Sequence, residues 1–175
     1  MPLNLLSVIA VYAALSKEMG LPLRWPGKEL AFSKMFQLTD AGLLARAAEW
    51  SGTAPGAADQ TFNITNGDYF RWEQLWSKIA VAFDMEMGPI QTVDLSRMMA
   101  DKELLWQSMI EKYGLQSTAF ADAANWAFGN YVLGNEWDVM SDTLKARKAG
   151  FHECQDSEAR FVEQLKELRA EKFVP

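Results

Sequence analysis

The sequence has one cysteine, Cys154, and one histidine, His152, among its 175 residues. A lone cysteine cannot form a disulfide within the chain, which fits a reducing compartment, and we expect a cytoplasmic protein. These two side chains are too few for a structural zinc site, which takes four nitrogen or sulfur ligands. They stand two residues apart on a predicted loop with no third group to orient them, which disfavours a nucleophile–base pair. We therefore expect no metal site.

Basic residues are also scarce. The chain has 17 Lys and Arg against 23 Asp and Glu, which gives a net charge of −6. Nucleic-acid binding needs a basic face to neutralise phosphates, so nucleic acid is excluded as an expected partner. The apolar run that begins at Leu5 and ends at Leu15 is shorter than the roughly 20 residues that cross a bilayer. It has no basic segment before it and Lys17-Glu18 after it, so it does not fit a signal peptide, and we expect no membrane association.

Glycine is present at 11 positions, but no two glycines stand in the Gly-x-Gly spacing. That spacing opens the phosphate-binding loop of Rossmann dinucleotide domains. The chain by itself is therefore expected to bind no dinucleotide cofactor.

Aromatic and aliphatic residues are abundant. Hydrophobic residues make up 49% of the chain, with 7 Trp and 10 Phe, which excludes a disordered protein. The length suffices for one domain over residues 1–175 with a sizeable core. So many tryptophans indicate either large aromatic-lined pockets and interfaces or plain core filling, and the composition does not separate the two.

The most informative segment is 61–76. Phe62 and Ile64 alternate with polar residues, which predicts a half-buried strand, and Asn66-Gly67 predicts a turn after it. Asp68 is the predicted N-cap of the helix that follows. The apolar stripe of that helix consists of Trp72, Leu75, Trp76, Ile79 and Phe83.

The remainder reads as predominantly helical α/β with a few short strands. Asn4 is predicted to cap a helix over 5–19, and Asp40 a helix that runs to Ser51. Short extended segments are expected at 21–25, 36–39 and 90–93. Further helices are predicted over 95–100, 102–113, 118–133, 136–149 and 157–171.

Several segments resemble, in the same order, those of one enzyme family. They are 11–15 (VYAAL), 20–24 (GLPLR), 39–41 (TDA), 62–72 (FNITNGDYFRW), 148–151 (KAGF) and 172–175 (KFVP). This ordered set resembles the progesterone 5β-reductase and iridoid synthase-like group of extended short-chain dehydrogenase/reductases. The resemblance covers the whole chain and ends at the same proline.

The resemblance implies a reductase that passes a hydride from NADP(H) to an α,β-unsaturated carbonyl compound. The family's catalytic Tyr and Lys lie upstream of the matched region, and no tyrosine here has a lysine four residues later. The chain is therefore interpreted as the substrate-binding, C-terminal half without the glycine-rich Rossmann half. It is expected to be inactive alone and to take a small apolar carbonyl substrate when a Rossmann domain completes it.

The same resemblance places a substrate pocket at Leu3, Phe32, Met35, Phe151 and Cys154. Leu3 stands where the family often has Met, and Cys154 where plant members have a Phe that covers the substrate. The sequence departs from the family after Phe151, so steroid or iridoid selectivity is not carried over. For each residue, ordinary core packing is the competing interpretation.

Two alternatives to a reductase half remain open: a non-catalytic binding or interaction module derived from such an enzyme, and a fragment produced by truncation or frameshift. The helix from Leu5 to Leu15 is apolar on nearly all sides. In the family its equivalent packs between the two domains, so one face is expected to lack its cover here. We therefore predict a homo-oligomer that forms through this helix.

Overall fold

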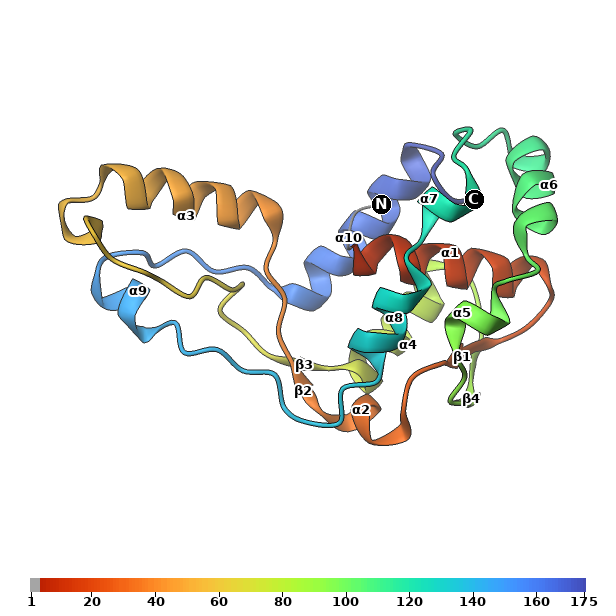
Figure 1. Cartoon of the computed structure of the whole chain (residues 1–175), viewed down its shortest axis with the longest axis horizontal. Coiled ribbons are helices and arrows are strands. Elements are labelled where there is room, and N and C mark those ends of the chain that lie inside the picture. Colours follow the sequence, from red (N-terminus) through yellow and green to blue (C-terminus); the bar gives the residue numbers. More distant parts are fainter. Residues whose placement is uncertain (1–3) are drawn as a thin grey trace.

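The computed structural model describes residues 4–175, so the predicted site residue Leu3 lies outside the described residues. This part of the chain is mostly helical with a few short strands, which agrees with the predicted class (Figure 1). The helices are α1 (Leu5–Glu18), α2 (Glu29–Ser33), α3 (Ala41–Thr53), α4 (Trp72–Ala82), α5 (Leu95–Met98), α6 (Glu103–Tyr113), α7 (Phe120–Ala123), α8 (Trp126–Leu133), α9 (Leu144–Lys148) and α10 (Ser157–Ala170), with a 3-10 turn, η1 (Pro55–Ala57). The strands are β1 (Leu23–Trp25), β2 (Met35–Phe36), β3 (Phe70–Arg71) and β4 (Met87–Ile90). β1 pairs with β4 in parallel, and β2 pairs with β3 antiparallel.

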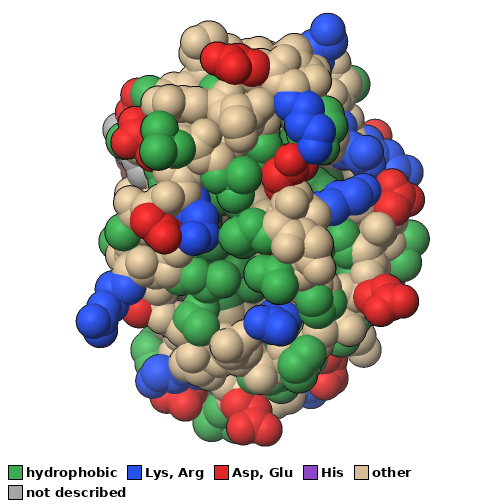
Figure 2. Space-filling model, turned by 90° about the vertical axis from the view of Figure 1, so that its right-hand side faces the viewer, with side chains coloured by type: hydrophobic (Ala, Val, Ile, Leu, Met, Phe, Trp, Pro, Cys, Tyr) green, Lys and Arg blue, Asp and Glu red, His purple; other side chains and the backbone are tan. Residues whose placement is uncertain are grey.

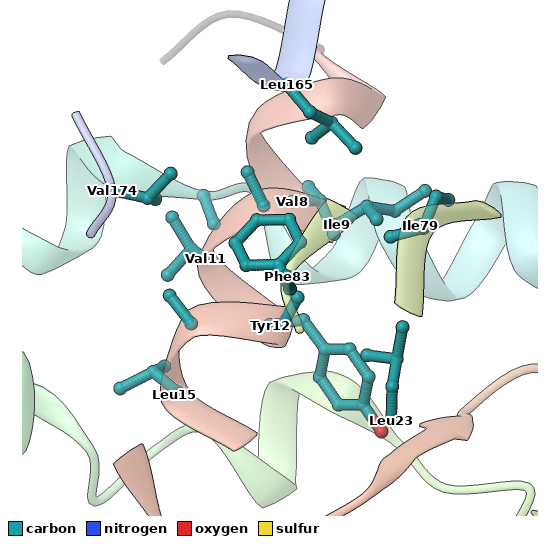
Figure 3. Close-up of a cluster of buried hydrophobic side chains, with 14 of the residues drawn as sticks. Val8, Ile9, Val11, Tyr12, Leu15, Leu23, Ile79, Phe83, Leu165 and Val174 are labelled. Atoms are coloured by element: carbon teal, nitrogen blue, oxygen red, sulfur yellow. The ribbon is translucent and has the colours of Figure 1, made fainter. Parts of the chain in front are cut away.

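Helix α1 is the centre of the main hydrophobic core. The predicted cap is confirmed, since the Asn4 side chain accepts hydrogen bonds from the amides of Leu6 and Ser7. Figure 3 shows side chains of α1 meeting those of Ile79, Phe83 and Leu165. Helices α7, α8 and α10 and strand β1 all pack against it.

The prediction that one face of α1 lacks a cover is wrong. Every residue from Val8 to Ser16 is at most 3% exposed within this one chain. The elements that follow α1 in the sequence supply the cover that had been expected from another domain. The middle of the helix from Leu5 to Leu15 therefore offers no surface for the predicted oligomer. Among residues 4–175, no helix is long and apolar enough to span a membrane.

A second, smaller hydrophobic cluster lies apart from the first. Leu43, Ala47, Ala146 and Phe151 form it, and Trp50 packs on Phe151 with ring centroids 5.3 Å apart. In Figure 1, α3 and α9 lie together at the end of the molecule opposite α6. The segments that join this end to the main core therefore decide how the two clusters sit relative to each other.

The 61–76 segment differs from its prediction in two ways. Phe62 and Ile64 pack against the smaller cluster, but they belong to no strand among the described residues, and the strand is β3. Asp68 does not cap α4, which begins at Trp72 without a side-chain cap. The turn is confirmed, since Gly67 has a φ of 95°. The alternating pattern correctly indicated inward-facing side chains, but burial alone does not provide a hydrogen-bonded partner strand.

Two predicted helices are also interrupted. The 118–133 helix breaks between α7 and α8, where the Asn125 side chain accepts from the Phe128 amide and starts a new helix. Only the last part of the predicted 136–149 helix is helical, as α9. The chain before α9 instead bonds to β2, where the Val139 amide donates to the Met35 carbonyl at 2.9 Å. The strand predicted at 90–93 is observed earlier in the chain, as β4. Because β4 is at the edge of its sheet, it can contain Pro89, which has no amide hydrogen to donate.

One end of the molecule leaves apolar side chains at the surface. Figure 2 views the end where α5, α6 and β4 lie in Figure 1, and hydrophobic side chains gather in the middle of it with charged ones around them. In β4, Met87 is 46% and Ile90 38% exposed. Apolar patches with a polar rim are common at contact surfaces.

The aromatic core around α4 gives a direct test of the fold. Trp76 is fully buried, with its ring 5.0 Å from that of Trp25 in an edge-on arrangement. Replacing Trp76 by Ala is expected to lower the free energy of unfolding by about 3–5 kcal/mol, the usual cost of such a core truncation. Replacing the exposed Glu73 on the same helix by Ala should change it by less than about 0.5 kcal/mol. Urea unfolding measures both; similar losses for the two variants would contradict the burial described above.

Candidate functional site

A cavity of about 510 Å³ lies where the start of α1, the β2–α3 corner, α8 and α10 meet. Its apolar wall consists of Leu5, Leu6, Phe36, Leu38, Ala41, Phe128, Val132 and Phe161. Its polar lining consists of Asn4, Thr39, Asp40, Asn66, Ser157, Arg160 and Gln164. A mostly apolar cavity with a few grouped polar residues is the usual form of a small-molecule site.

The apolar wall is held in place by the main core behind it. The ring of Phe36 lies 5.4 Å from that of Trp72 and 6.0 Å from that of Phe70, measured between centroids. Phe161 meets Trp72 edge-on at 6.5 Å. Because Trp72 and Phe70 are buried, the two phenylalanines have little freedom to turn away. The wall is therefore largely formed before any ligand arrives.

Asn66 joins the β2–α3 corner to the start of α10. Its side chain is buried; Oδ1 accepts from the Asp40 amide at 2.6 Å, and Nδ2 donates to Ser157 Oγ at 3.0 Å. Its backbone amide donates to the Leu38 carbonyl at 2.9 Å, and its carbonyl accepts from the Gln155 amide at 2.8 Å. With both ends of the side chain and both backbone groups engaged, Asn66 acts as a structural joint.

Asp68 completes this joint from the other side. Its carboxylate accepts from the Ser157 amide at 2.8 Å and from the Ser157 hydroxyl at 2.6 Å. Ser157 is the first residue of α10 and is fully buried. Asp68 therefore binds the N-terminus of α10 rather than that of α4, and it fixes the buried hydroxyl that also receives the Asn66 amide.

An ion pair lies at the polar end of the cavity. Arg160 Nε is 3.0 Å from Asp40 Oδ2, and the two side chains are 23% and 7% exposed. Arg160 also donates from Nη1 to Glu163 at 2.7 Å and to Glu167 at 2.8 Å. Three carboxylates thus surround one guanidinium, so the arginine is not a free cation for an anionic ligand.

These contacts set the protonation states. Burial disfavours the charged form of Asp40, but the hydrogen bonds from Arg160 and from the Leu43 amide outweigh it and hold the pKa of the carboxyl below its usual value. The Glu167 and Asp40 carboxylates raise the pKa of Arg160 above its already high value. Both groups are therefore charged throughout the neutral range.

The structure does not bring the predicted pocket residues together. Phe32 packs on Trp25 with ring centroids 5.0 Å apart, and Met35 lies in β2 opposite Arg71. Phe151 is buried in the smaller cluster, and Cys154 is exposed. None of Phe32, Met35, Phe151 and Cys154 lines the cavity, although Phe36, next to Met35, does, and Asn4 and Leu5 follow Leu3 in the sequence.

Sequence reasoning missed Leu38, Asn66 and Arg160. Asn66 had been assigned to a turn, and its buried side chain gave no separate signal. Arg160 is 120 residues from Asp40 along the chain, and nothing in the spacing of the two indicates that they pair. The position of Arg160 directly before Phe161, the first residue of the apolar stripe of 157–171, is the one local signal that could have pointed to it.

Few groups in the cavity lining carry acid–base or nucleophilic chemistry. Among residues 4–175, no histidine, cysteine or tyrosine lines it, and the Ser157 hydroxyl is committed to Asp68. Within residues 4–175 no cluster of three His, Cys, Asp or Glu side chains is arranged to hold a metal ion. These residues can enclose and orient an apolar molecule.

Comparison with known proteins identifies the relatives of this chain. No family model matches it. It is 35% identical over 178 residues to an (S)-8-oxocitronellyl enol synthase of Nepeta cataria and 32% identical over 176 residues to that of Antirrhinum majus. It is 31% identical over 176 residues to a 3-oxo-Delta(4,5)-steroid 5-beta-reductase of Arabidopsis thaliana. Each match covers 99% of this chain.

The chain is related to the C-terminal part of the iridoid synthase and 5β-reductase family. The resemblance inferred from the ordered sequence segments is thereby confirmed. The chain spans 45% of the length of each of these curated relatives. What those whole proteins bind and catalyse is therefore not transferred by similarity alone.

The Asp40–Arg160 pair gives a pH-dependent prediction. Asp40→Asn keeps an N-cap side chain on α3 but removes the charge, and should lower the free energy of unfolding at pH 7 by about 1–3 kcal/mol. Because the pKa of Asp40 is depressed in the folded state, its contribution exists above the ordinary value of 3.8 and disappears as the pH falls through the lower folded value. Urea unfolding should thus show the variant and the wild type converging in acid. An equal difference at neutral and at acid pH would contradict this.

Proposed function

We propose that this chain is the substrate-binding part of an NAD(P)-dependent reductase that acts on a small apolar α,β-unsaturated carbonyl compound. The observation that carries the proposal is the preformed apolar cavity, in a chain that aligns over 99% of its length with enol synthases and a steroid 5-beta-reductase. The cavity can enclose an apolar molecule, and its one lining carboxylate, Asp40, is held in an ion pair with Arg160. In such a reductase this chain would bind the substrate, and the domain that holds the cofactor would carry out the hydride transfer.

The side chains of the wall determine what this part contributes. Leu38, Phe36 and Phe161 would contact the apolar body of the substrate and exclude water from it. Thr39 and Gln164 place neutral polar groups at the polar end, where Arg160 is already neutralised. The Thr39 hydroxyl donates to the Ile64 carbonyl and the Gln164 side-chain nitrogen to Asp40, so their oxygen atoms remain as acceptors. This combination favours uncharged substrates over carboxylates or phosphates.

We infer that NADP(H), the hydride donor implied by the family, is not held by this chain's own residues. Dinucleotide sites place a pyrophosphate at a helix N-terminus behind a glycine-rich loop. Here α3 and α10, two of the longer helices, carry Asp40 and Asp156 at their N-caps, and carboxylates there repel phosphate. We infer that a separate dinucleotide-binding domain holds the cofactor.

Two surfaces are suited to contact such a domain. Residues 61–65 follow an extended path between the two clusters and pair with no strand among residues 4–175 (Figure 1). An unpaired extended segment can accept a strand from another sheet. The apolar surface at the end of the molecule seen in Figure 2 is the second. Both support completion of the site by further polypeptide.

The alternative is a non-catalytic binding module derived from such a reductase. The engagement of the one lining carboxylate, Asp40, in an ion pair with Arg160 is equally compatible with it. A fusion separates the two functions: the chain would be placed behind the part of the Nepeta cataria enol synthase that it does not match. A reductase half should restore ligand-dependent NADPH oxidation, whereas a folded fusion that binds ligand without oxidising NADPH would favour the module.

Ligand titrations of the chain alone test the assignment of the cavity. A 3-oxo-Δ4,5-steroid should quench tryptophan fluorescence on binding, and Leu38→Asp should weaken this binding about tenfold or more by placing a charge in the apolar wall. Leu104→Asp, at a position 79% exposed and outside the cavity, is the matched control. NADPH should bind no tighter than about millimolar, because the sequence has no Gly-x-Gly loop to receive its pyrophosphate. Micromolar NADPH binding, or equal effects of the two variants, would contradict the proposal.

A further inference from the structure

The side chain of Gln164 is only half engaged at the polar end of the cavity. Gln164 lines the cavity one turn after Arg160 in α10. Its Nε2 donates to Asp40 Oδ2 at 3.3 Å, the same oxygen that Arg160 Nε reaches at 3.0 Å. Among residues 4–175, no group donates a hydrogen bond to Gln164 Oε1. The amide nitrogen is therefore bound, and the amide oxygen is an acceptor without a donor in the described part of the chain.

The charge on Asp40 decides which way this amide group points. The ion pair with Arg160 holds the carboxylate in its ionised form. An ionised carboxylate can only accept hydrogen bonds, so the nitrogen of the Gln164 amide, and not its oxygen, must face it. Turning the amide by half a rotation would bring two acceptors, Oε1 and Oδ2, against each other. The ion pair thereby fixes Oε1 on the side of the amide that is turned away from Asp40.

A hydrogen-bond donor lies one turn away on the same helix. Arg160 Nε is bound to Asp40 and Nη1 to Glu163 and Glu167, but no acceptor for Nη2 is found among the described residues. Of these three carboxylates only Asp40 lines the cavity, and it is paired, so this end has no unpaired anionic group to attract a cationic ligand. The polar end thus offers a neutral acceptor together with a donor whose charge is already balanced.

We propose that Gln164 receives a hydroxyl group of the substrate, so that the compounds bound in this cavity are apolar molecules with a hydroxyl group at one end. A hydroxyl both donates and accepts, so it can bind Gln164 Oε1 and Arg160 Nη2 together, whereas a carbonyl group has no hydrogen to donate to Oε1. A ligand that lacks a donor displaces the water that solvates Oε1 without replacing its hydrogen bond, and loses affinity for that reason.

This assignment of the substrate class rests on the proposed function, in which a separate domain holds the cofactor. The α,β-unsaturated carbonyl then faces that domain, where the hydride is transferred. The opposite end of the molecule meets the polar lining formed by Asp40, Arg160 and Gln164. The substrate is therefore expected to carry two polar groups, the unsaturated carbonyl at one end and the hydroxyl at the other.

Two steroids that differ in one group test the role of Gln164 on the whole chain. A 3-oxo-Δ4,5-steroid with a 17-hydroxyl group should bind about five- to tenfold more tightly than its 17-oxo counterpart, as measured by tryptophan fluorescence quenching. Gln164→Leu removes the acceptor and should bring the two dissociation constants to within about twofold of each other. Gln74→Leu makes the same change at an exposed position of α4 outside the cavity and should keep the preference.

The results distinguish a failure of this proposal from a failure of the proposed function. A preference for the hydroxyl compound in the wild type and in Q74L that is absent from Q164L, with circular dichroism showing each variant folded, would establish the role of Gln164. Equal binding of the two steroids to the wild type would overturn the hydroxyl preference and leave the proposed function standing. A preference that persists in folded Q164L would overturn the assignment to Gln164. Binding of neither steroid would overturn the proposed function, and this proposal with it.

Discussion

The buried hydroxyl of Ser157 is the point on which the arrangement of the molecule depends. It receives a hydrogen bond from the Asn66 amide and donates one to the Asp68 carboxylate, while its backbone amide also binds Asp68. Asn66 in turn holds the backbone of Asp40 at the start of α3. Through these few bonds the start of α10 fixes the direction in which the chain leaves the main core toward the smaller cluster. The Asn66–Ser157 bond is buried and the other three are partly buried, so breaking one leaves a polar group with little access to water.

The cavity is a consequence of this joint. Its apolar wall belongs to the main core, where α1, α8 and α10 pack, and its polar end belongs to the corner that Asn66 and Asp40 form. Neither part would make a site alone. The Asp40–Arg160 pair adds a second bond between the same corner and α10, and the surrounding carboxylates leave the site without net positive charge. A site of this kind suits an uncharged apolar molecule, as the proposed function requires.

The sequence predicts the local features well and the long-range ones poorly. Asn4 and Asp40 cap helices as expected, and Trp72 and Trp76 are buried, because caps and apolar stripes depend on neighbours within a few residues. Asp68 was misassigned because an aspartate before a helix fits a cap equally well whether it binds that helix or a distant one. The apolar helix α1 is covered rather than bare for the same reason: which segment packs on it is decided by the whole fold. To predict the cavity, one would have to know which residues far apart in the sequence are hydrogen-bonded, such as Asn66 and Ser157. No local sequence pattern indicates such pairs.

Hydrogen–deuterium exchange in a Ser157→Ala variant tests the central role of this joint most directly. The account predicts that amides of α3 exchange roughly five- to tenfold faster than in the wild type, the factor that corresponds to about 1 kcal/mol for a lost hydrogen bond, while amides from Val8 to Ser16 in α1 are unchanged. Unchanged exchange in α3 would contradict the account. So would an equal acceleration of α3 and α1, because the hydroxyl would then stabilise the whole fold and not the junction between the two clusters.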